Sequence, residues 1–418
     1  MTLVRRLLPF LALAATLACS DAAGPGGPPP KITSLPRQLS GSEQAVIGAS
    51  NSFGFNLLRE VNKTFADSNV FLSPLSASMA LGMTMNGAVG TTFTEMRSTL
   101  GFGTQTYEEL NAAYESLIAL LLDLDERVAF QIANAIFYRQ SIGSAIEPAF
   151  LDDARSHFDA EVAGLNFGAP EAVTTVNDWA KTNTNGKIPK VIDRIGAEIV
   201  MLLMNAIYFK GDWRAGFATA DTRNLPFTTI TGTQVSTPTM YRKGGFRLGH
   251  AAGGATVVEL PYGGDAFVMT ILLPAPGTSV NAVTAGLDAA AWSQLTANLQ
   301  DSELELFLPK FRIAWEDTLN DELKAMGMRQ AFVGDVADFS RISRSMGPHL
   351  YIDFVKQNSF VDVNEVGTEA AAVTTVGVGV TSLPPQIRID RPFVFAIRER
   401  LSGTILFLGK IVEPKISS

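Results

Sequence analysis

Thiol and imidazole side chains are scarce in this sequence of 418 residues. Cys19 is the only cysteine, which excludes an intramolecular disulfide, a thiolate zinc site and a cysteine nucleophile in the core. His157, His250 and His349 are the only histidines, and none occurs in a metal-binding spacing, so we interpret each as a surface or packing residue. No serine occupies a Gly-x-Ser-x-Gly elbow. The sequence therefore predicts neither a metal centre nor an enzyme.

Charged residues are also few, at 18% of the chain, and the formal net charge is −8. Mild acidity without a dense cluster of lysine and arginine argues against nucleic acid as a partner. The segment from Tyr107 to Arg127 is rich in carboxylates, so a polyanion would find little to bind there. Hydrophobic residues make up 46% of the chain, which is enough for a large core.

The first 18 residues have the pattern of a secretory signal. Two arginines precede an apolar run over residues 7–17, which is too short to span a bilayer. Thr16-Leu17-Ala18-Cys19 resembles a bacterial lipobox, although the usual leucine three places before the cysteine is Thr16 here. We expect an exported protein, periplasmic or extracellular, that is anchored to a membrane if Cys19 carries a lipid. The alternative is an ordinary signal peptide in which Cys19 is incidental.

Composition divides the rest of the chain into two parts. Residues 19–45 are rich in glycine, proline and serine and cannot form a core, so we predict a flexible tether. Residues 46–418 read as one folded domain. Its predicted helices cluster early and its predicted strands cluster late, without βαβ alternation, which favours an α+β fold.

Hydrophobic periodicity and turn residues predict the elements of this domain. We expect helices over residues 51–65, 74–87, 90–100, 287–299 and 319–326, with two more starting near Phe150 and Val176. We expect strands over residues 69–73, 128–138, 201–213, 227–231, 234–240, 245–249, 256–262, 267–274, 303–311, 351–363, 391–397 and 405–411.

A segment from Glu365 to Pro385 has an unusual composition. Both of its charges lie at its start, small and β-branched residues fill its middle, and two prolines close it. As a surface loop it would be mobile, and as a strand it would fit a pleated sheet. Alternate residues of the strand would present one small, uncharged face, namely Thr368, Ala370, Ala372, Thr374 and Val376. A linker or an ordinary edge strand remains the alternative.

Several motifs in this chain together resemble the serpins, the serine protease inhibitor family. They are the hinge-like Val363–Ala372, the segments 69–76, 86–92 and 257–262, and the closing strands that begin at Arg391. The resemblance runs from about residue 50 to residue 415. It implies the serpin fold, in which N-terminal helices pack on a large, mainly antiparallel sheet. It also implies further β-sheets and an exposed reactive-centre loop at about residues 365–385.

The resemblance assigns four residues to the shutter, the region beneath the main sheet. Ser73 and Ser76 match shutter serines, and Ser73 also suits a helix N-cap; both roles can hold at once. Asn205 falls in an apolar strand and needs hydrogen-bond partners, which those serines would supply. Gln357 stands where many serpins have a histidine, and an amide can make similar hydrogen bonds.

Further matches lie at the breach, the region where the hinge meets the sheet. Trp213 matches a breach tryptophan, and Lys310 with Glu365 matches a salt bridge at the top of the sheet. The simpler interpretation of the last two is a surface pair of little energetic value.

The resemblance also implies the function, which is inhibition of serine proteases. Counting forward from Gly367 and back from Pro384 places the scissile bond between Thr381 and Ser382, with Val380 as the alternative specificity residue. A small β-branched side chain there suits elastase-like or subtilisin-like proteases. We expect a monomer with no cofactor, no metal and no membrane contact except through lipidated Cys19.

A non-inhibitory serpin, acting as a binding or substrate protein, is the alternative function. Such serpins usually carry charged, bulky or proline residues in the hinge. Here the hinge reads Glu365, Gly367, Thr368, Glu369, Ala370, Ala371 and Ala372, and its residues after Gly367 are small except for Glu369. This composition favours inhibition, because small side chains can enter a crowded sheet.

Overall fold

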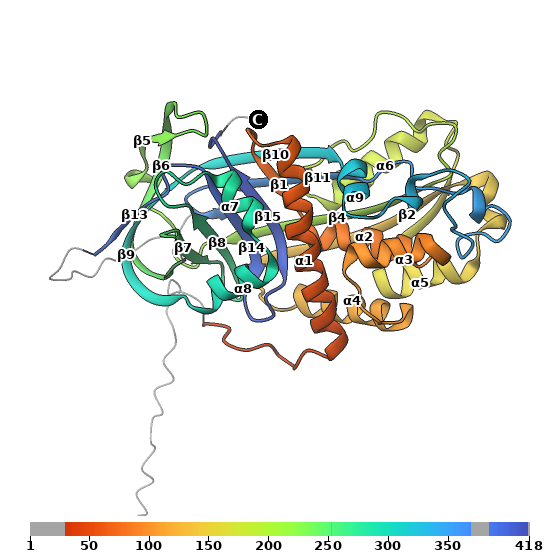
Figure 1. The fold of residues 1–418 in the computed structure, drawn as a ribbon, viewed down its shortest axis with the longest axis horizontal. Helices are drawn as coiled ribbons and strands as arrows, with labels where there is room; N and C mark the ends of the chain where they lie inside the picture. Colours follow the sequence, from red (N-terminus) through yellow and green to blue (C-terminus); the bar gives the residue numbers. More distant parts are fainter. Residues whose placement is uncertain (1–29, 252, 369–383, 417–418) are drawn as a thin grey trace, which may run out of the picture.

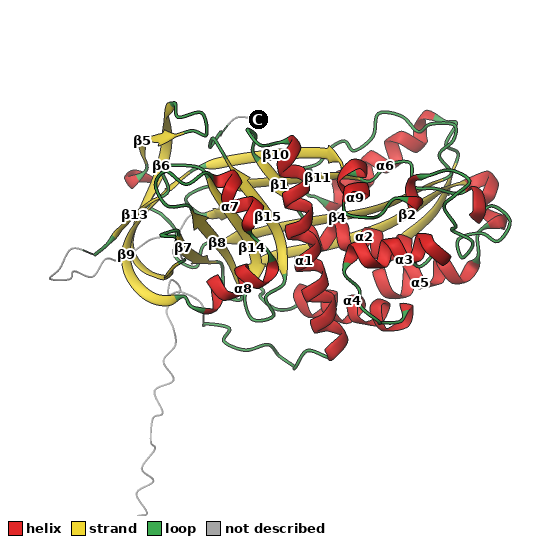
Figure 2. Cartoon of the chain, viewed as in Figure 1, coloured by secondary structure: helices red, strands yellow, loops and turns green. Residues whose placement is uncertain are grey.

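Two β-sheets and a set of surrounding helices make up the protein. The computed structural model describes residues 30–251, 253–368 and 384–416, so the predicted signal peptide and Cys19 lie outside the described residues. Strands of the smaller sheet run lengthwise through the molecule, and the other sheet lies at the left end in Figure 1. Most helices gather at the opposite end, as Figure 2 shows. This arrangement confirms the predicted α+β class.

The smaller sheet has six strands in the order β10-β11-β12-β4-β2-β3. All neighbouring pairs are antiparallel except β2 with β3, which is parallel. Its strands are β2 (Val128–Arg139), β3 (Ala160–Leu165), β4 (Met201–Asp212), β10 (Phe311–Thr318), β11 (Lys356–Val363) and β12 (Gly367–Thr368).

The larger sheet has nine strands in the order β1-β15-β14-β8-β7-β6-β9-β13, with β5 paired to β6. Three of its strands are buried at every residue, and they are mostly apolar, as expected for strands covered on both faces. The polar exceptions are Thr270, Arg398, Glu399 and Lys410. Its strands are β1 (Val70–Leu72), β5 (Arg223–Thr228), β6 (Gln234–His250), β7 (Thr256–Pro261), β8 (Phe267–Leu273), β9 (Gln300–Pro309), β13 (Gln386–Arg388), β14 (Phe393–Glu399) and β15 (Ile405–Ile411).

The helices cover these sheets. They are α1 (Gly41–Thr64), α2 (Pro74–Met85), α3 (Gly90–Leu100), α4 (Tyr107–Leu122), α5 (Pro148–Phe158), α6 (Pro170–Asn183), α7 (Val280–Gly286), α8 (Ala289–Ala297) and α9 (Asn320–Ala325). α2 begins as predicted, with Ser73 as N-cap and Pro74 in the first turn. Within the described part of the chain, no helix combines the length and the apolarity needed to cross a membrane.

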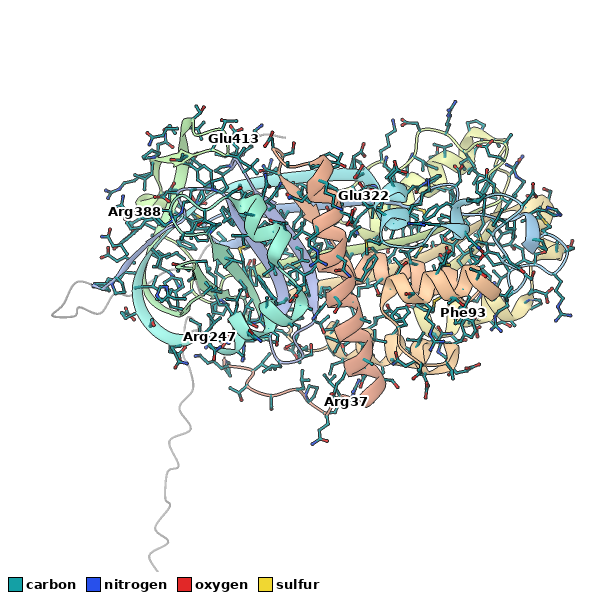
Figure 3. All side chains as sticks on the ribbon, viewed as in Figure 1. Arg37, Phe93, Arg247, Glu322, Arg388 and Glu413 are labelled. Atoms are coloured by element: carbon teal, nitrogen blue, oxygen red, sulfur yellow. The ribbon has the colours of Figure 1, made fainter. Side chains whose placement is uncertain are left out.

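α1 starts ten residues earlier than the sequence predicted, and residues 41–45 therefore belong to the helix and not to the tether. Ser40 and Glu43 form a reciprocal capping box that starts the helix. Burial alone would raise the pKa of the Glu43 carboxylate, but hydrogen bonds from Arg37, the Ser40 backbone and Ser116 lower that pKa to about 2. Arg37 lies beside the lower end of α1 in Figure 3 and ties the preceding segment to the domain.

One pair of predicted strands is a single strand in the structure. The prediction ended a strand at 240 and began another at 245, because Gly244 and Gly245 are typical turn residues. Their backbone groups instead continue the ladder with β9, opposite Leu304 and Glu303, so β6 runs unbroken from Gln234 to His250. Backbone pairing with a long neighbour outweighed the weak strand preference of glycine.

Candidate functional site

The two residues of β12 join the middle strands of the six-stranded sheet. Thr368 pairs with Val363 of β11 on one side and with Gly211 of β4 on the other, and Gly367 pairs with Asp212. β12 lies within the predicted hinge segment, which begins at Glu365. The chain therefore enters the sheet between β11 and β4 at the point where the sequence placed the beginning of a strand.

The rest of β4 and β11 is not bridged in this way. β4 has 12 residues and β11 has eight, yet the two strands are neighbours only through the two residues of β12 in the described structure. A cavity of about 420 Å³ is lined in part by residues 201–206 of β4 and 356–358 of β11, and otherwise mainly by residues of α2, α6 and the segments 188–200 and 339–355. A smaller cavity nearer to β12 is lined by Tyr208, Phe360 and Thr368. We call this space between β4 and β11, from Thr368 to Met201, the sheet opening.

Gly367 is required by how closely β12 approaches β4. A Cβ atom at this position would lie 2.1 Å from the carbonyl oxygen of Gly211 and 2.7 Å from the Cα of Asp212. Both atoms belong to the backbone of a paired strand and cannot move at little cost. Only glycine therefore allows the hinge to pair with β4.

Glu365 forms the predicted salt bridge with Lys310, at 2.7 Å between Oε2 and Nζ. The interpretation as a surface pair is wrong, because Glu365 is only 7% exposed. Its Oε1 accepts a hydrogen bond from Thr222 at 2.8 Å, and its backbone oxygen accepts one from Phe217 N. Burial acts to raise the pKa of Glu365, but the hydrogen bonds from Lys310, its own backbone and Thr222 outweigh this and lower it.

We expect Glu365→Gln to lower the thermal midpoint at neutral pH and to have little effect in acid. A carboxyl group whose folded pKa lies below its ordinary value of 4.5 stabilises the fold above that pH, and this contribution is lost as the pH falls through the folded pKa. Thermal melts of both proteins between about pH 7 and pH 3 measure the difference. A constant difference across that range would contradict the role of the charge.

Trp213 holds the segment before β12. Its indole Nε1 donates to the carbonyl oxygen of Asn364 at 2.9 Å, and its backbone N–H donates to Val366 O at 2.7 Å. The tryptophan follows directly after β4 and is 3% exposed. The residue that the resemblance assigned to the breach therefore fixes the turn that leads the hinge into the sheet.

Ser73 and Gln357 meet beneath the sheet opening. The Gln357 amide donates from Nε2 to Ser73 O at 2.8 Å and accepts from Ser73 N at 3.2 Å. The Ser73 hydroxyl donates to Leu406 O at 2.8 Å and accepts from the N–H of Ser76. The Gln357 amide therefore bonds both backbone groups of Ser73, and Ser73 acts as a helix cap at the same time.

Asn205 has the hydrogen-bond partners that its place in an apolar strand demanded, although its side chain is only partly buried. Its Oδ1 accepts a hydrogen bond from the Ser76 hydroxyl, and its Nδ2 donates to Oδ1 of Asn134 at 2.6 Å. Asn134 in turn donates to Phe158 O. This row of polar groups links α2, β4, β2 and α5, and each member has at least one partner.

Two contacts at the site had no prediction from the sequence. Thr222 bonds Glu365, and the hydroxyls of Tyr262 and Thr368 lie 2.8 Å apart. Tyr262 closes the motif over residues 257–262, and that motif was its only signal. The other predicted site residues, Thr381 and Ser382 of the reactive bond and Glu369 to Ala372 of the hinge, lie outside the described residues. Among residues that the structure describes, no group of three could hold a metal ion.

Comparison with known proteins identifies the family. The family model described as "Serpin (serine protease inhibitor)" matches residues 48–414. A serpin-like protein of Thermococcus kodakarensis is 34% identical over 386 residues, which are 90% of this chain and 87% of that protein. Human leukocyte elastase inhibitor is 32% identical over 387 residues, covering 89% of this chain and all of the relative.

Solved structures agree with this identification. Human thyroxine-binding globulin, solved in complex with thyroxine, has a TM-score of 0.80 at 30% identity, and the match covers 90% of this chain and 100% of that chain. The thermophilic serpin tengpin in its native state has a TM-score of 0.79 at 28% identity, covering 91% of this chain and 97% of its own. The family thus holds protease inhibitors and binding proteins, which are not enzymes. With its hinge between β11 and β4 and its match over residues 48–414, this chain belongs to the serpins.

Proposed function

We propose that this chain inhibits serine proteases by a single-use mechanism in which its reactive-centre loop is cut and inserted into the sheet opening. One observation carries the proposal. The hinge already lies between β11 and β4 at Gly367 and Thr368, and the sheet opening continues from there. A strand that continues from Thr368 would pair with both neighbours.

The reaction begins as ordinary proteolysis. The protease serine Oγ attacks the carbonyl carbon of Thr381 and forms an ester, the bond to Ser382 N breaks, and the new amine takes the serine's proton through the protease histidine. The freed segment then adds to the sheet as a strand. Residues 368–381 number 14 and reach about 46 Å when extended. The attached protease is carried that distance, and distortion of its active site stops hydrolysis of the ester.

Specificity follows from the small side chain at Thr381. A β-branched threonine fits a shallow apolar pocket and offers nothing to the acidic pocket of a trypsin-like protease. We therefore propose elastase-like or subtilisin-like targets. The relative named leukocyte elastase inhibitor supports this class.

Incubation with pancreatic elastase and with subtilisin tests the proposal. We expect a complex that survives SDS and heat, with new N-terminus Ser382 in the released peptide. Trypsin, and an elastase whose active serine is replaced by alanine, should give no such complex. Cleavage without a stable complex would favour the binding or substrate alternative, of which thyroxine-binding globulin is a structural example. A new N-terminus of Thr381 would make Val380 the specificity residue.

We also propose that the protein is exported and anchored through a lipid on Cys19. The lipobox-like segment before Cys19 and the absence of other cysteines support this placement. Mass spectrometry of the mature N-terminus from membranes checks it, with Cys19→Ser as the control that should appear in the soluble fraction. An unmodified Cys19 in the mature protein would leave only an ordinary signal peptide.

A further inference from the structure

The side chain of Tyr262, which follows directly after β7, contacts the hinge strand β12. Its hydroxyl lies 2.8 Å from the Thr368 hydroxyl, and either group can donate. Tyr262 is fully buried and Thr368 is 3% exposed, so water does not compete for this hydrogen bond. The contact joins the hinge to the residue that follows β7, which lies 106 positions earlier in the sequence.

The tyrosine ring is fixed by its neighbours. It stacks on Trp213 with ring centroids 4.4 Å apart and meets the edge of Phe209 at 5.1 Å. On the third side it approaches the backbone of β4, where a Cβ on Gly211 would lie 2.8 Å from the ring. These contacts fix the orientation of the ring, and its hydroxyl group points toward Thr368.

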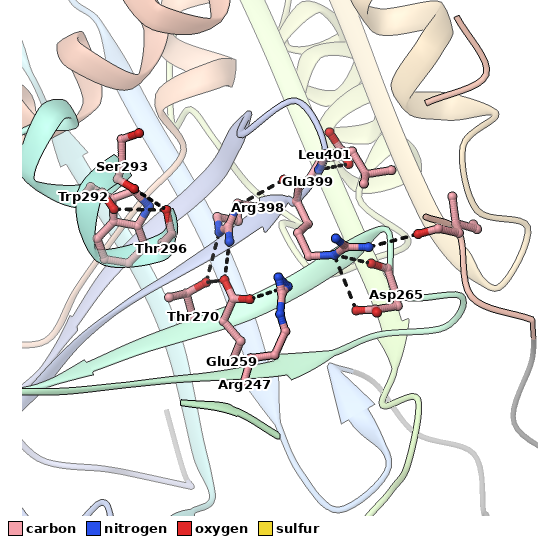
Figure 4. Close-up of polar contacts among 12 residues, drawn as sticks. Arg247, Glu259, Asp265, Thr270, Trp292, Ser293, Thr296, Arg398, Glu399 and Leu401 are labelled. Atoms are coloured by element: carbon pink, nitrogen blue, oxygen red, sulfur yellow. Dashed lines mark hydrogen bonds and ion pairs between the residues drawn. The ribbon is translucent and has the colours of Figure 1, made fainter. Parts of the chain in front are cut away.

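The backbone that carries Tyr262 is anchored as well. Just before it, Glu259 is buried in β7 between Arg398 and Arg247, with Thr270 donating to Glu259 at 2.8 Å, as Figure 4 shows. Just after it, Gly263 N bonds to Asp212 O, and Gly264 N bonds to Asp125 at 2.7 Å. Ion pairs and backbone hydrogen bonds thus hold the tyrosine from both sides.

We propose that Tyr262 is a positioning residue that fixes Thr368 between β4 and β11 as the first residue of the inserting strand. This inference rests on the proposed inhibitory function. Starting a strand is the costly step, because chain entropy is lost before the following residues form their contacts. When Tyr262 holds Thr368 in place, the first residue pair of the new strand is already formed. Insertion is therefore faster relative to hydrolysis of the ester. The hydroxyl therefore raises the fraction of protease that is trapped.

The test removes one hydroxyl at a time. Tyr262→Phe keeps the ring stack, and Thr368→Val keeps the shape of the hinge residue. A hydrogen bond of ordinary strength changes the rate of insertion by about two- to tenfold. We expect each variant to increase the ratio of cleaved to complexed inhibitor by about that factor. The second-order rate of loop acylation should stay unchanged, because neither residue contacts the protease.

A double-mutant cycle separates positioning from general weakening. The two changes together should be no worse than either alone, since both remove the same contact. Thr368→Ser should behave like the wild type. Tyr114→Phe is the matched control, because Tyr114 is also buried and bonded to a hydroxyl, that of Ser78 on α2. It should lower stability without changing the ratio of products.

The outcomes distinguish this inference from the proposed function. A wild-type protein that forms no stable complex with any serine protease refutes the inhibitory function itself. If the wild type traps protease and the Tyr262→Phe and Thr368→Val variants give the same ratio of cleaved to complexed inhibitor as the wild type, only the positioning role is overturned. Effects that add in the double variant, or an equal effect of Tyr114→Phe, also overturn it.

Discussion

Under the proposed mechanism, Gly367→Val is expected to convert this serpin from an inhibitor into a substrate. The added Cβ would lie 2.1 Å from Gly211 O, well inside the distance at which atoms repel. The conflict involves the backbone of β4, which is paired along its length with β2, so β12 must leave the sheet. Without Gly367 and Thr368 in place, the cut loop has no start for insertion, and the ester is hydrolysed first.

Gel analysis after incubation with elastase measures this result. We expect the band of the stable complex to fall by at least about tenfold while the cleaved inhibitor accumulates, because about 1.4 kcal/mol in the barrier to insertion corresponds to a factor of ten in rate. Gly286→Val is the control, since nothing lies within 4 Å of a Cβ at that position in α7. Undiminished complex formation by Gly367→Val would show that pairing of β12 with β4 is not needed for inhibition.

Local chemistry made part of the site predictable. The need for hydrogen-bond partners of an amide in an apolar strand led from Asn205 to the serines of α2, and the structure contains the bond from Ser76. The pairing of Lys310 with Glu365 followed from the family motif. The burial of Glu365 did not, because Glu365 is also bonded by Phe217 and Thr222, which come from a distant segment.

The predicted boundaries of helices and strands were wrong where two local sequence signals disagreed. Ser40 and Glu43 carry the spacing of a capping box, but they follow a stretch rich in glycine and proline, and composition decided the prediction. At Gly244 and Gly245 the same preference for composition broke a continuous strand in two. In both cases a specific backbone hydrogen-bond pattern outweighed the average behaviour of the residue types.

The contact of Tyr262 with Thr368 could not be predicted from the sequence. It joins residues 106 positions apart, and neither the period of a strand nor that of a helix relates them. The sheet opening is of the same kind, since it depends on β4 and β11 being joined through β12 alone among the residues that the structure describes. Motif spacing shows which residues belong to a site, whereas their distances follow from the tertiary fold.

Cutting the loop between Thr381 and Ser382 should raise the thermal midpoint of the protein by about 10 °C or more. Each inserted residue exchanges hydrogen bonds to water for hydrogen bonds to two strands, and it loses backbone entropy. The net stabilisation is on the order of 0.5–1 kcal/mol per residue. Thr368 is already paired in the intact protein, and over the 13 residues from Glu369 to Thr381 the gain reaches about 10 kcal/mol. For a domain of this size, 1 kcal/mol shifts the midpoint by roughly 1 °C.

Differential scanning calorimetry of the intact and cleaved proteins checks this difference. Gly367→Val provides the matched control, because its loop can be cut but lacks a start for insertion, so cleavage should leave its midpoint unchanged. The difference between the two cleaved proteins then measures strand addition without the effect of a broken chain. Equal midpoints for intact and cleaved wild type would mean that the native fold stores no energy for insertion, since a kinetically held state must lie above the product it forms.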